Sequence, residues 1–280
     1  MLDLNEYHYV ISKLRSFFTS KGYVEVPVQS RLSILAACED PETIAKFEFS
    51  DTLWPLPQTG QMWLEYELLK NPDLPGVFCI STSYRDEPNP IPGRHDKVFP
   101  MFEFEGRGDV QDLMNIEKEL IRYLGFTGEI YELKYEDVAK FYSAKSLEAD
   151  HESKMTIDFS SVVLLTNFPF ESHPFWNMKH RSDNIFNKVD VILHGMETIG
   201  SSERSCNVEE MRDFFHRVSN GGYADKLFGI FGKERVLKEL EEYFSLPMSK
   251  RFGAGIGVGR MIRALKHEGV LKGEKSVSKV

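Results

Sequence analysis

The segment that most restricts the fold is residues 77–106, where two strand-forming runs flank a loop rich in proline and charge. The run VFCISTS (77–83) is largely apolar, and MFEFEG (101–106) alternates apolar and charged residues. Strict alternation is typical of a strand with one buried face, and the PNPIPG loop between the runs interrupts regular structure. An antiparallel hairpin with charge at both ends of its loop is therefore expected.

The charged and aromatic residues of this hairpin suit a nucleoside triphosphate. Arg85 and Glu87 follow the first strand, Arg94 and His95 stand in the loop, and Phe99 leads into the second strand. A guanidinium group forks onto phosphate oxygens, and an aromatic ring stacks on a base. A catalytic base is the alternative for His95, but its basic neighbours and the absence of an evident Ser or Cys nucleophile favour phosphate binding.

Composition sets the class of protein. The 280 residues, 41% hydrophobic and 28% charged, resemble an ordinary soluble globular protein with one large domain or two small ones. No apolar run is long enough to span a membrane and the N-terminus lacks a signal pattern, so a cytoplasmic protein is expected. Cys38, Cys79 and Cys206 are widely spaced, which predicts reduced thiols rather than a disulfide framework or a zinc site.

The net charge of −9 argues against a large nucleic-acid interface. Proteins that bind a nucleic-acid backbone usually carry a basic face or tail. Only local basic spots occur here, at 250–251 and between 266 and 279. A tRNA partner is therefore disfavoured but not excluded.

Periodicity along the chain predicts one α+β domain, residues 1–280, built around a mainly antiparallel sheet. We find no internal repeat or linker, and we interpret the charged, irregular stretch of about 126–160 as a surface excursion. The other expected elements are helices at 4–20, 61–70, 109–123, from 207 to about 220, 233–244 and 261–267, and strands at 23–28, 162–168, 189–195 and 252–260.

The glycine-rich segment FGAGIGVGR (252–260) is not a dinucleotide-binding fingerprint, because its glycines alternate and only 20 residues follow Arg260. Alternating glycines on a strand clear one face of a sheet, so that a ligand can lie close. A close packing point between helix and sheet explains the pattern equally well. In the first interpretation, Arg260 stands at the strand–helix junction and reaches a terminal phosphate.

The stretch VDVILHGMETIGSSER (189–204) contains two carboxylates and an arginine that are candidates for a binding site. Asp190 and Glu197 are candidate magnesium ligands, since Mg²⁺ takes few protein carboxylates and keeps several waters. For Asp190 a purely structural role is about as plausible. Arg204 ends a run of small residues and resembles a fixed cation on a pocket floor, suited to a carboxylate or amide oxygen. Glu39 and Gln61 are polar residues in apolar surroundings, a pattern that on its own more often marks surface positions.

Taken in order, these segments resemble the catalytic core of a class II aminoacyl-tRNA synthetase, within the aspartyl/asparaginyl branch. The segment 22–28 resembles the first class motif, a helix and strand at a dimer interface, and 84–105 and 252–260 resemble the second and third. Shorter matches to asparaginyl enzymes are CED (38–40), TGQMWLE (59–65), LTNFPFESHPFWNMK (165–179) and ETIGSSER (197–204). The resemblance spans nearly the whole chain. It implies that each subunit contains an antiparallel sheet flanked by helices, and that two subunits form a homodimer.

For ATP, the resemblance implies a role for each matching residue. Arg85 contacts the α-phosphate and the amino-acid carboxylate, and Glu87 reads the adenine amino group. Arg94 and His95 hold the outer phosphates. Phe99 stacks on adenine opposite Arg260, which also contacts the γ-phosphate. Arg85 and Arg260 are thus the implied catalytic residues.

For the metal and the amino acid, the implied roles fall on other segments. Glu197, together with Asp190, binds Mg²⁺. Glu39 and Gln58 hold the substrate's α-amino group. Arg204 and Gln61 read its side-chain amide or carboxylate.

Three departures from the family pattern bear on the function. Aspartyl enzymes carry a lysine where this chain has Gln61, so aspartate would lose one expected charge partner. The helix of the first motif begins near residue 4, so the anticodon-binding barrel of aspartyl and asparaginyl enzymes is expected to be absent. Gly259 stands where an acidic residue usually precedes the arginine of the third motif. The chain therefore resembles stand-alone relatives of this branch, including the archaeal asparagine synthetase, which adenylates aspartate and passes it to ammonia.

Three functions follow as hypotheses. The first is an AMP-forming ligase that adenylates aspartate or a close analogue and transfers it to ammonia or a small amine without tRNA. The second is aminoacylation of a tRNA or another macromolecule, and the pair formed by Gln61 and Arg204 would favour asparagine as its substrate. The third is an amino-acid sensor, which the retention of a full set of ATP-site residues argues against.

Overall fold

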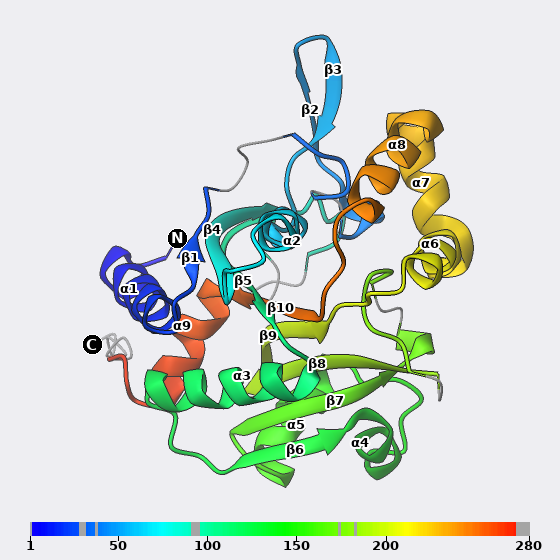
Figure 1. The fold of residues 1–280 in the computed structure, drawn as a ribbon. Helices are drawn as coiled ribbons and strands as arrows, with labels where there is room; N and C mark the ends of the chain where they lie inside the picture. Colours follow the sequence, from blue (N-terminus) through cyan, green and yellow to red (C-terminus); the bar gives the residue numbers. More distant parts are fainter. Residues whose placement is uncertain are drawn as a thin grey trace.

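The structure is a computed structural model that describes residues 2–27, 32–36, 39–90, 96–172, 175–181 and 184–272. Its centre is an eight-stranded mixed sheet, ordered β1-β4-β5-β10-β9-β8-β7-β6 (Figure 1). Neighbouring strands are antiparallel except in the pairs β1–β4 and β6–β7. The fold class expected from the sequence, an α+β protein with a mainly antiparallel sheet flanked by helices, is confirmed.

The described elements have the following bounds. The strands of the large sheet are β1 (Val24–Glu25), β4 (Gly76–Tyr84), β5 (Val98–Arg107), β6 (Ile130–Lys134), β7 (Val162–Pro169), β8 (Ile185–Leu193), β9 (Met196–Glu203) and β10 (Arg251–Gly257), and β2 (Lys46–Phe49) pairs with β3 (Thr52–Pro55). The helices are α1 (Leu4–Ser20), α2 (Gln61–Lys70), α3 (Val110–Leu124), α4 (Tyr135–Phe141), α5 (Ala149–Asp158), α6 (Val208–Arg217), α7 (Gly222–Phe231), α8 (Lys233–Phe244) and α9 (Val258–His267), with 3-10 turns at Pro41–Thr43, Phe170–Ser172 and Val218–Gly221.

The hairpin expected from the sequence is strands β4 and β5. Their register runs from Gly76 opposite Gly106 to Tyr84 opposite Val98. Because side chains alternate along a strand, Phe102 and Phe104 point to one face, and Glu103 and Glu105 point to the other. The hairpin therefore separates an apolar layer from a polar one.

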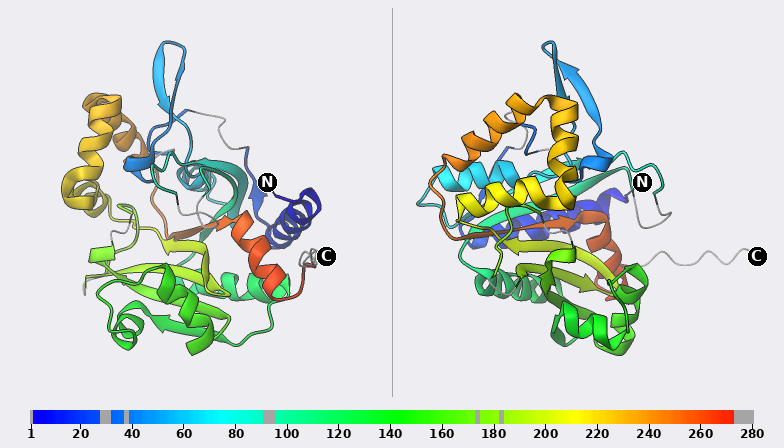
Figure 2. Two further views of the ribbon diagram at one scale, coloured as in Figure 1. Left: turned by 180° about the vertical axis from the view of Figure 1, so that it is seen from behind. Right: turned by 90° about the vertical axis from the view of Figure 1, so that its right-hand side faces the viewer.

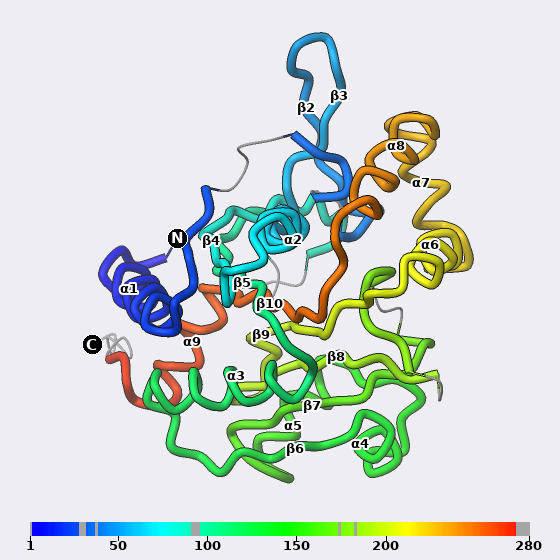
Figure 3. Tube along the Cα trace, viewed as in Figure 1, coloured from blue at the N-terminus to red at the C-terminus, as the bar shows by residue number. Residues whose placement is uncertain are grey.

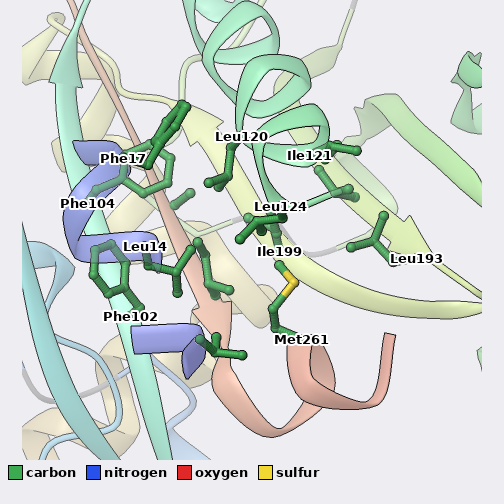
Figure 4. Packing of buried hydrophobic residues seen from close by; sticks show 14 of the residues in the cluster. Leu14, Phe17, Phe102, Phe104, Leu120, Ile121, Leu124, Leu193, Ile199 and Met261 are labelled. Atoms are coloured by element: carbon green, nitrogen blue, oxygen red, sulfur yellow. The ribbon is translucent and has the colours of Figure 1, made fainter. Parts of the chain in front are cut away.

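The apolar face of the sheet is covered by α1, α3 and α9, which together bury the larger core. Side chains from α1 and β5, such as Leu14 and Phe104, interlock there with those of α3 and α9, such as Leu124 and Met261 (Figure 4). Asp3 caps α1 by accepting hydrogen bonds from two backbone amides, and Asp109 caps α3 in the same way. These caps fix where the covering helices begin.

Helix α2 lies against the polar face, and a second helical group, α6–α8, stands beside it. These helices stand together on one side of the molecule, and the β2–β3 hairpin projects beside them (Figure 2). They bury their own core around Trp176, Tyr223 and Tyr243. The sequence pattern did not predict α7, because adjacent glycines such as those at 221 and 222 are typical of a helix end, whereas Gly222 here begins a further helix.

The interpretation of residues 126–160 as a surface excursion is wrong in one respect. Strand β6 pairs in parallel with β7 and forms the edge of the main sheet, and α4 and α5 bury a small core with Met155 (Figure 3). Much of β6 is exposed, so its charged side chains obscure the alternation that predicts a strand. Among the described residues, no helix is long and apolar enough to cross a membrane, and Cys79 and Cys206 are free thiols.

The alternating glycines of β10 make room for the protein's own side chains. A Cβ atom at Gly253 would lie 1.7 Å from Glu105 Oε1, and one at Gly255 would lie 2.9 Å from Gln61 Nε2. Gly253 lies between Glu105 on β5 and Ser202 on β9 in the register. The glycine at 253 therefore lets the Glu105 carboxylate extend over β10, on the polar face of the sheet, and reach Arg204.

Glu117 of α3 carries a buried carboxyl group on the core side of the sheet. It is fully buried, and neither of its oxygens has a hydrogen-bond partner in the described part of the chain. The nearby Ser201 hydroxyl donates instead to the carbonyl of Val189. Burial, with a smaller contribution from Asp190, raises the pKa of Glu117 to about 8.

Replacing Gly253 with alanine is predicted to destabilise the protein by about 1–3 kcal/mol, because the new methyl group would overlap Glu105. Gly229→Ala in α7 is the matched control, since nothing lies within 4 Å of the position of its Cβ. That change should stabilise by about 0.5–1 kcal/mol. Urea denaturation of both variants measures the difference, and equal stabilities would contradict the account of β10.

Replacing Glu117 with glutamine is predicted to remove a pH dependence of stability. The folded state keeps Glu117 protonated up to a pKa of about 8, whereas the unfolded chain releases the proton near its ordinary pKa of 4.5. Wild-type stability should therefore fall relative to the variant as the pH rises from 5 to 8, by at most about 1.4 kcal/mol per pH unit. Denaturation curves at both pH values test this, and parallel behaviour would refute it.

Candidate functional site

The polar face of the central strands gathers most of the residues singled out from the sequence. Glu103 and Glu105 of β5 lie beside the glycines of β10, and Gly200 and Ser202 of β9 lie beyond them. The N-terminal end of α2 approaches this face, because Glu103 accepts hydrogen bonds from Thr59 Oγ1 and from the Gly60 amide at 2.7 Å. Three strands and one helix thus converge on one polar surface.

Arg85 stands at the end of β4 with its guanidinium group held from two sides. Its Nη2 donates to Glu39 Oε2 at 2.6 Å, and its Cζ lies 5.7 Å from the centre of the Phe99 ring. The Glu39 carboxylate raises the pKa of Arg85, so this side chain is a permanent cation. Its Nε is buried and has no hydrogen-bond partner among the described residues, which leaves a donor for an anionic ligand.

Arg204 is buried at the end of β9, where its guanidinium group donates to three side chains. It donates to Glu105 Oε1 at 2.5 Å, to Gln61 Oε1 at 2.6 Å and to Ser202 Oγ at 2.8 Å. The structure thus brings Gln61 and Arg204 together, as the sequence predicted. Burial raises the pKa of Glu105 to about 7, and the Arg204 guanidinium opposes that rise.

A second ion pair, which the sequence did not reveal, lies next to the first. Arg251 donates to Glu65 Oε2 from Nε at 2.8 Å, and the hydroxyl of Tyr243 donates to the same oxygen at 2.7 Å. Asn177 Nδ2 donates to Glu65 Oε1 at 2.7 Å. All of these side chains are buried. The signal for Glu65 was its place on an otherwise apolar face of α2, between Met62 and Leu69.

The side-chain amide of Gln58 is hydrogen-bonded to neighbouring protein groups and is not free to contact a ligand. Its Oε1 accepts from the amides of Glu39 and Asp40 at 2.8 and 2.7 Å, and its Nε2 donates to the carbonyl of Asp40 and to Thr43 Oγ1. Every hydrogen-bonding site of this amide is thereby occupied. The predicted contact of Gln58 with a substrate amino group is replaced by a role in positioning Glu39.

The two candidate metal ligands converge over Gly200. A Cβ atom there would lie 3.0 Å from Glu197 Oε1, a tight contact, and 3.8 Å from Asp190 Oδ1, an ordinary van der Waals contact, so glycine at this position leaves room for Glu197. Asp190 Oδ1 is buried and unpartnered among the described residues. Its Oδ2 accepts from Lys188 Nζ at 2.5 Å, a contact that the sequence did not predict. Burial raises the pKa of Asp190 to about 7, while Lys188 lowers it.

These two carboxylates suit a hard cation such as Mg²⁺, which binds oxygen and keeps several waters. The orphaned Asp190 Oδ1 and the nearby Glu197 Oε1 are the oxygens that would hold it. Among the described residues there is no group of three or more His, Cys, Asp or Glu side chains arranged for a metal. A metal that keeps most of its waters fits this donor set better than one that needs four protein ligands.

Other residues predicted to bind ATP lie at one end of the same face. Arg260, in the first turn of α9, donates to the carbonyl of Glu197 at 2.9 Å. Gly257 pairs with Met101, so the N-terminus of α9 lies near the end of β5 that carries Phe99. Glu87 is half-buried and close enough to Arg85 to raise its pKa. Arg94 and His95 lie outside the described residues.

A small cavity of ≈30 Å³ opens between these groups. It is bounded by the polar residues described above and by apolar side chains of α2 and of the segment before β8. The lining residues are Glu39, Thr59, Gln61, Met62, Glu65, Phe175, Asn177, Met178 and Arg204. Its position between Glu39 and Arg204 suits a small polar ligand with an amino group at one end.

Arg251→Met is predicted to destabilise the protein by about 3–5 kcal/mol, because it leaves Glu65 as a buried carboxylate without its cation. The matched control is Arg212→Met, which breaks the exposed pair between Arg212 and Glu241 and should cost less than about 1 kcal/mol. Thermal or urea unfolding measures both. Similar costs for the two variants would show that the buried pair does not support the site.

Comparison with known proteins places this geometry in a family. The family model described as tRNA synthetases class II (D, K and N) matches residues 3–272. A curated relative, the asparagine–tRNA ligase of Thermoplasma acidophilum, is 23% identical over 297 aligned positions, which cover 92% of this chain and 64% of that protein.

Solved structures share the fold at low sequence identity. The asparaginyl-tRNA synthetase of Pyrococcus horikoshii, complexed with asparaginyl-adenylate, superposes with a TM-score of 0.77 at 19% identity and covers 95% of this chain and 65% of that one. The aspartyl-tRNA synthetase of Entamoeba histolytica gives 0.72 at 17% identity, covering 95% of this chain and 55% of that one. The chain therefore spans less than two thirds of the length of these relatives.

Proposed function

Because the chain belongs to the class II tRNA synthetases of the D, K and N family, we propose that it activates an asparagine-like amino acid with ATP. The products of this step are an aminoacyl adenylate and pyrophosphate. The observation that carries the proposal is Arg85, a half-buried cation whose buried Nε is an unused donor, and which lies between Glu39 and Phe99. A P. horikoshii enzyme of the same fold has been solved with asparaginyl-adenylate, which supports this choice of reaction.

The proposed chemistry needs no protein nucleophile. A carboxylate oxygen of the amino acid attacks the α-phosphorus of ATP in line, the bond from that phosphorus to the bridging oxygen breaks, and pyrophosphate leaves. Arg85 Nε and Nη groups donate to the carboxylate and the α-phosphate, and so neutralise charge that develops in the transition state. Phe99 stacks on the adenine, and Arg260 reaches the outer phosphates. Positioning and charge neutralisation supply most of the rate.

Divalent metal would bind between Asp190 and Glu197 and supply further positive charge for the phosphates. The protein's own contribution is to hold the two carboxylates near each other over Gly200. Lys188 balances part of their negative charge. Glu39, fixed by Gln58, receives the substrate's α-amino group at the mouth of the cavity. The side chain of the substrate then extends toward Arg204.

For the acceptor, we propose a tRNA or another macromolecule, because the curated relative is named a tRNA ligase. Transfer to ammonia or a small amine, with aspartate as the activated acid, is the competing proposal. The net charge of −9 favours it, since proteins that bind a nucleic-acid backbone usually carry a basic face or tail. We further propose that residues 1–280 form a single catalytic domain and that two copies pair through α1 and β1, where Leu4 and Val24 are exposed.

The first half-reaction is tested by pyrophosphate exchange across a panel of amino acids. We predict that asparagine or a close analogue supports exchange, and that Arg85→Ala lowers kcat/KM by about 100–1,000-fold, as loss of a transition-state donor does elsewhere. Arg212→Ala, on an exposed helix face, should leave the rate unchanged. Exchange with no amino acid, or full activity in a folded Arg85→Ala variant, would contradict the proposal.

The acceptor is identified by product analysis of the same preparation with total tRNA and, separately, with ammonia. Aminoacyl-tRNA without free amide product supports the tRNA acceptor. Free asparagine formed from aspartate and ammonia without tRNA would replace it with the amine acceptor. Both outcomes leave the adenylation step intact.

A further inference from the structure

We propose that Asn177 is a specificity-determining residue that selects a side-chain amide over a carboxylate. Its Oδ1 would accept a hydrogen bond from the NH₂ group of the substrate, while Arg204 donates to the amide oxygen. The inference rests on the proposed amino-acid activation and names the substrate class, an amino acid of the asparagine type. It depends on one unpartnered atom and on how the surrounding ion network orients it.

Asn177 is placed rigidly at the wall of the cavity. It is 1% exposed and lines the cavity together with Gln61 and Arg204. Its carbonyl accepts from the Ser205 amide at 2.8 Å, and its neighbour Met178 forms a β-bridge with Arg204. The backbone of Asn177 is thus tied to the strand end that carries the cavity's arginine.

The orientation of the Asn177 amide is fixed by Glu65. Nδ2 donates to Glu65 Oε1 at 2.7 Å, whereas Oδ1 is buried and has no partner among the described residues. Rotating the amide by half a turn would place Oδ1 against the oxygen of Glu65, where two acceptors repel. Glu65 cannot turn away, because Arg251 and Tyr243 hold its other oxygen. Oδ1 is therefore a buried acceptor without a donor among the described residues, which is unfavourable until a ligand supplies one.

The cavity's size admits an amide and a carboxylate equally, so the choice falls to hydrogen bonding. A volume of ≈30 Å³ holds about two water-sized groups, which matches the terminal pair of atoms of either side chain. An amide presents one acceptor and two donors, which complement Arg204 on one wall and Asn177 Oδ1 on the other. A carboxylate presents only acceptors, one of which would face Oδ1.

The balance of charges around the cavity also favours a substrate with a neutral side chain. Arg204 is already paired with Glu105 at 2.5 Å, and Arg251 is paired with Glu65 at 2.7 Å. Two buried cations thus balance two buried carboxylates, and neither cation is left over for a carboxylate ligand. A substrate that brought a further negative charge here would remain uncompensated in a buried site.

The test compares L-asparagine and L-aspartate in wild type and in Asn177→Leu, which keeps the volume but removes the acceptor. Binding is measured by isothermal titration without ATP, and turnover by pyrophosphate exchange. We expect wild type to prefer asparagine by about 10–100-fold, the equivalent of one buried hydrogen bond. In the variant, the affinity and exchange rate for asparagine should fall by that factor. The same quantities for aspartate should change by less than about 3-fold. Asn187→Leu, on β8 outside the cavity, is the matched control and should keep the preference.

Several outcomes would overturn the inference. These are a wild-type preference for aspartate, binding of neither amino acid, or an unchanged preference in a folded Asn177→Leu variant. If that variant fails to fold, Asn177→Ser takes its place, because it keeps only a shorter hydroxyl and should still weaken the preference. The binding arm separates this inference from the proposed reaction: exchange can fail while selective asparagine binding persists, and exchange can succeed with aspartate alone.

Discussion

The polar face of this protein depends on four buried charges that neutralise one another. Glu105 pairs with Arg204, and Glu65 pairs with Arg251, all within a sheet and helix interior that excludes water. Such groups are costly to bury singly, so each member needs the others in place. The consequence is geometric: the arginine at the cavity floor, the glutamine of α2 and the amide of Asn177 are held in fixed orientations before any ligand arrives.

The glycines of β10 connect this network to the sheet. Gly253 gives Glu105 room to cross toward Arg204, and Gly255 gives room to Gln61. On β9, Gly200 serves the same purpose for the carboxylate of Glu197. Three glycines on neighbouring strands thus determine which side chains can meet. The two larger packed cores flank this polar strip of the sheet.

Much of this arrangement could be predicted from the sequence, and the failures have physical causes. The hairpin was predictable because its alternation is strict, and the residues chosen at 39, 61, 85, 197 and 204 lie on the polar face or at its edge. Strand β6 was missed because an exposed edge strand tolerates charge on both faces. Glu65 and Arg251 were missed because a buried charge is recognisable only beside its partner, and these two residues lie on different elements far apart in sequence. Lys188 was missed although Asp190 is two residues away on the same strand, because the sequence does not show that the two side chains meet. Gln58 was assigned to the substrate because sequence cannot show that its amide is already fully bonded.

We infer that this face is an amino-acid adenylation site whose inner cavity binds a side-chain amide in preference to a carboxylate. A crystal structure of the protein with a non-hydrolysable asparaginyl-adenylate analogue tests it most directly. The account predicts the adenine ring on Phe99, the phosphate mimic on Arg85, and the side-chain amide between Arg204 and Asn177 Oδ1. An analogue bound elsewhere, or bound here with its side chain directed away from Arg204, would contradict it.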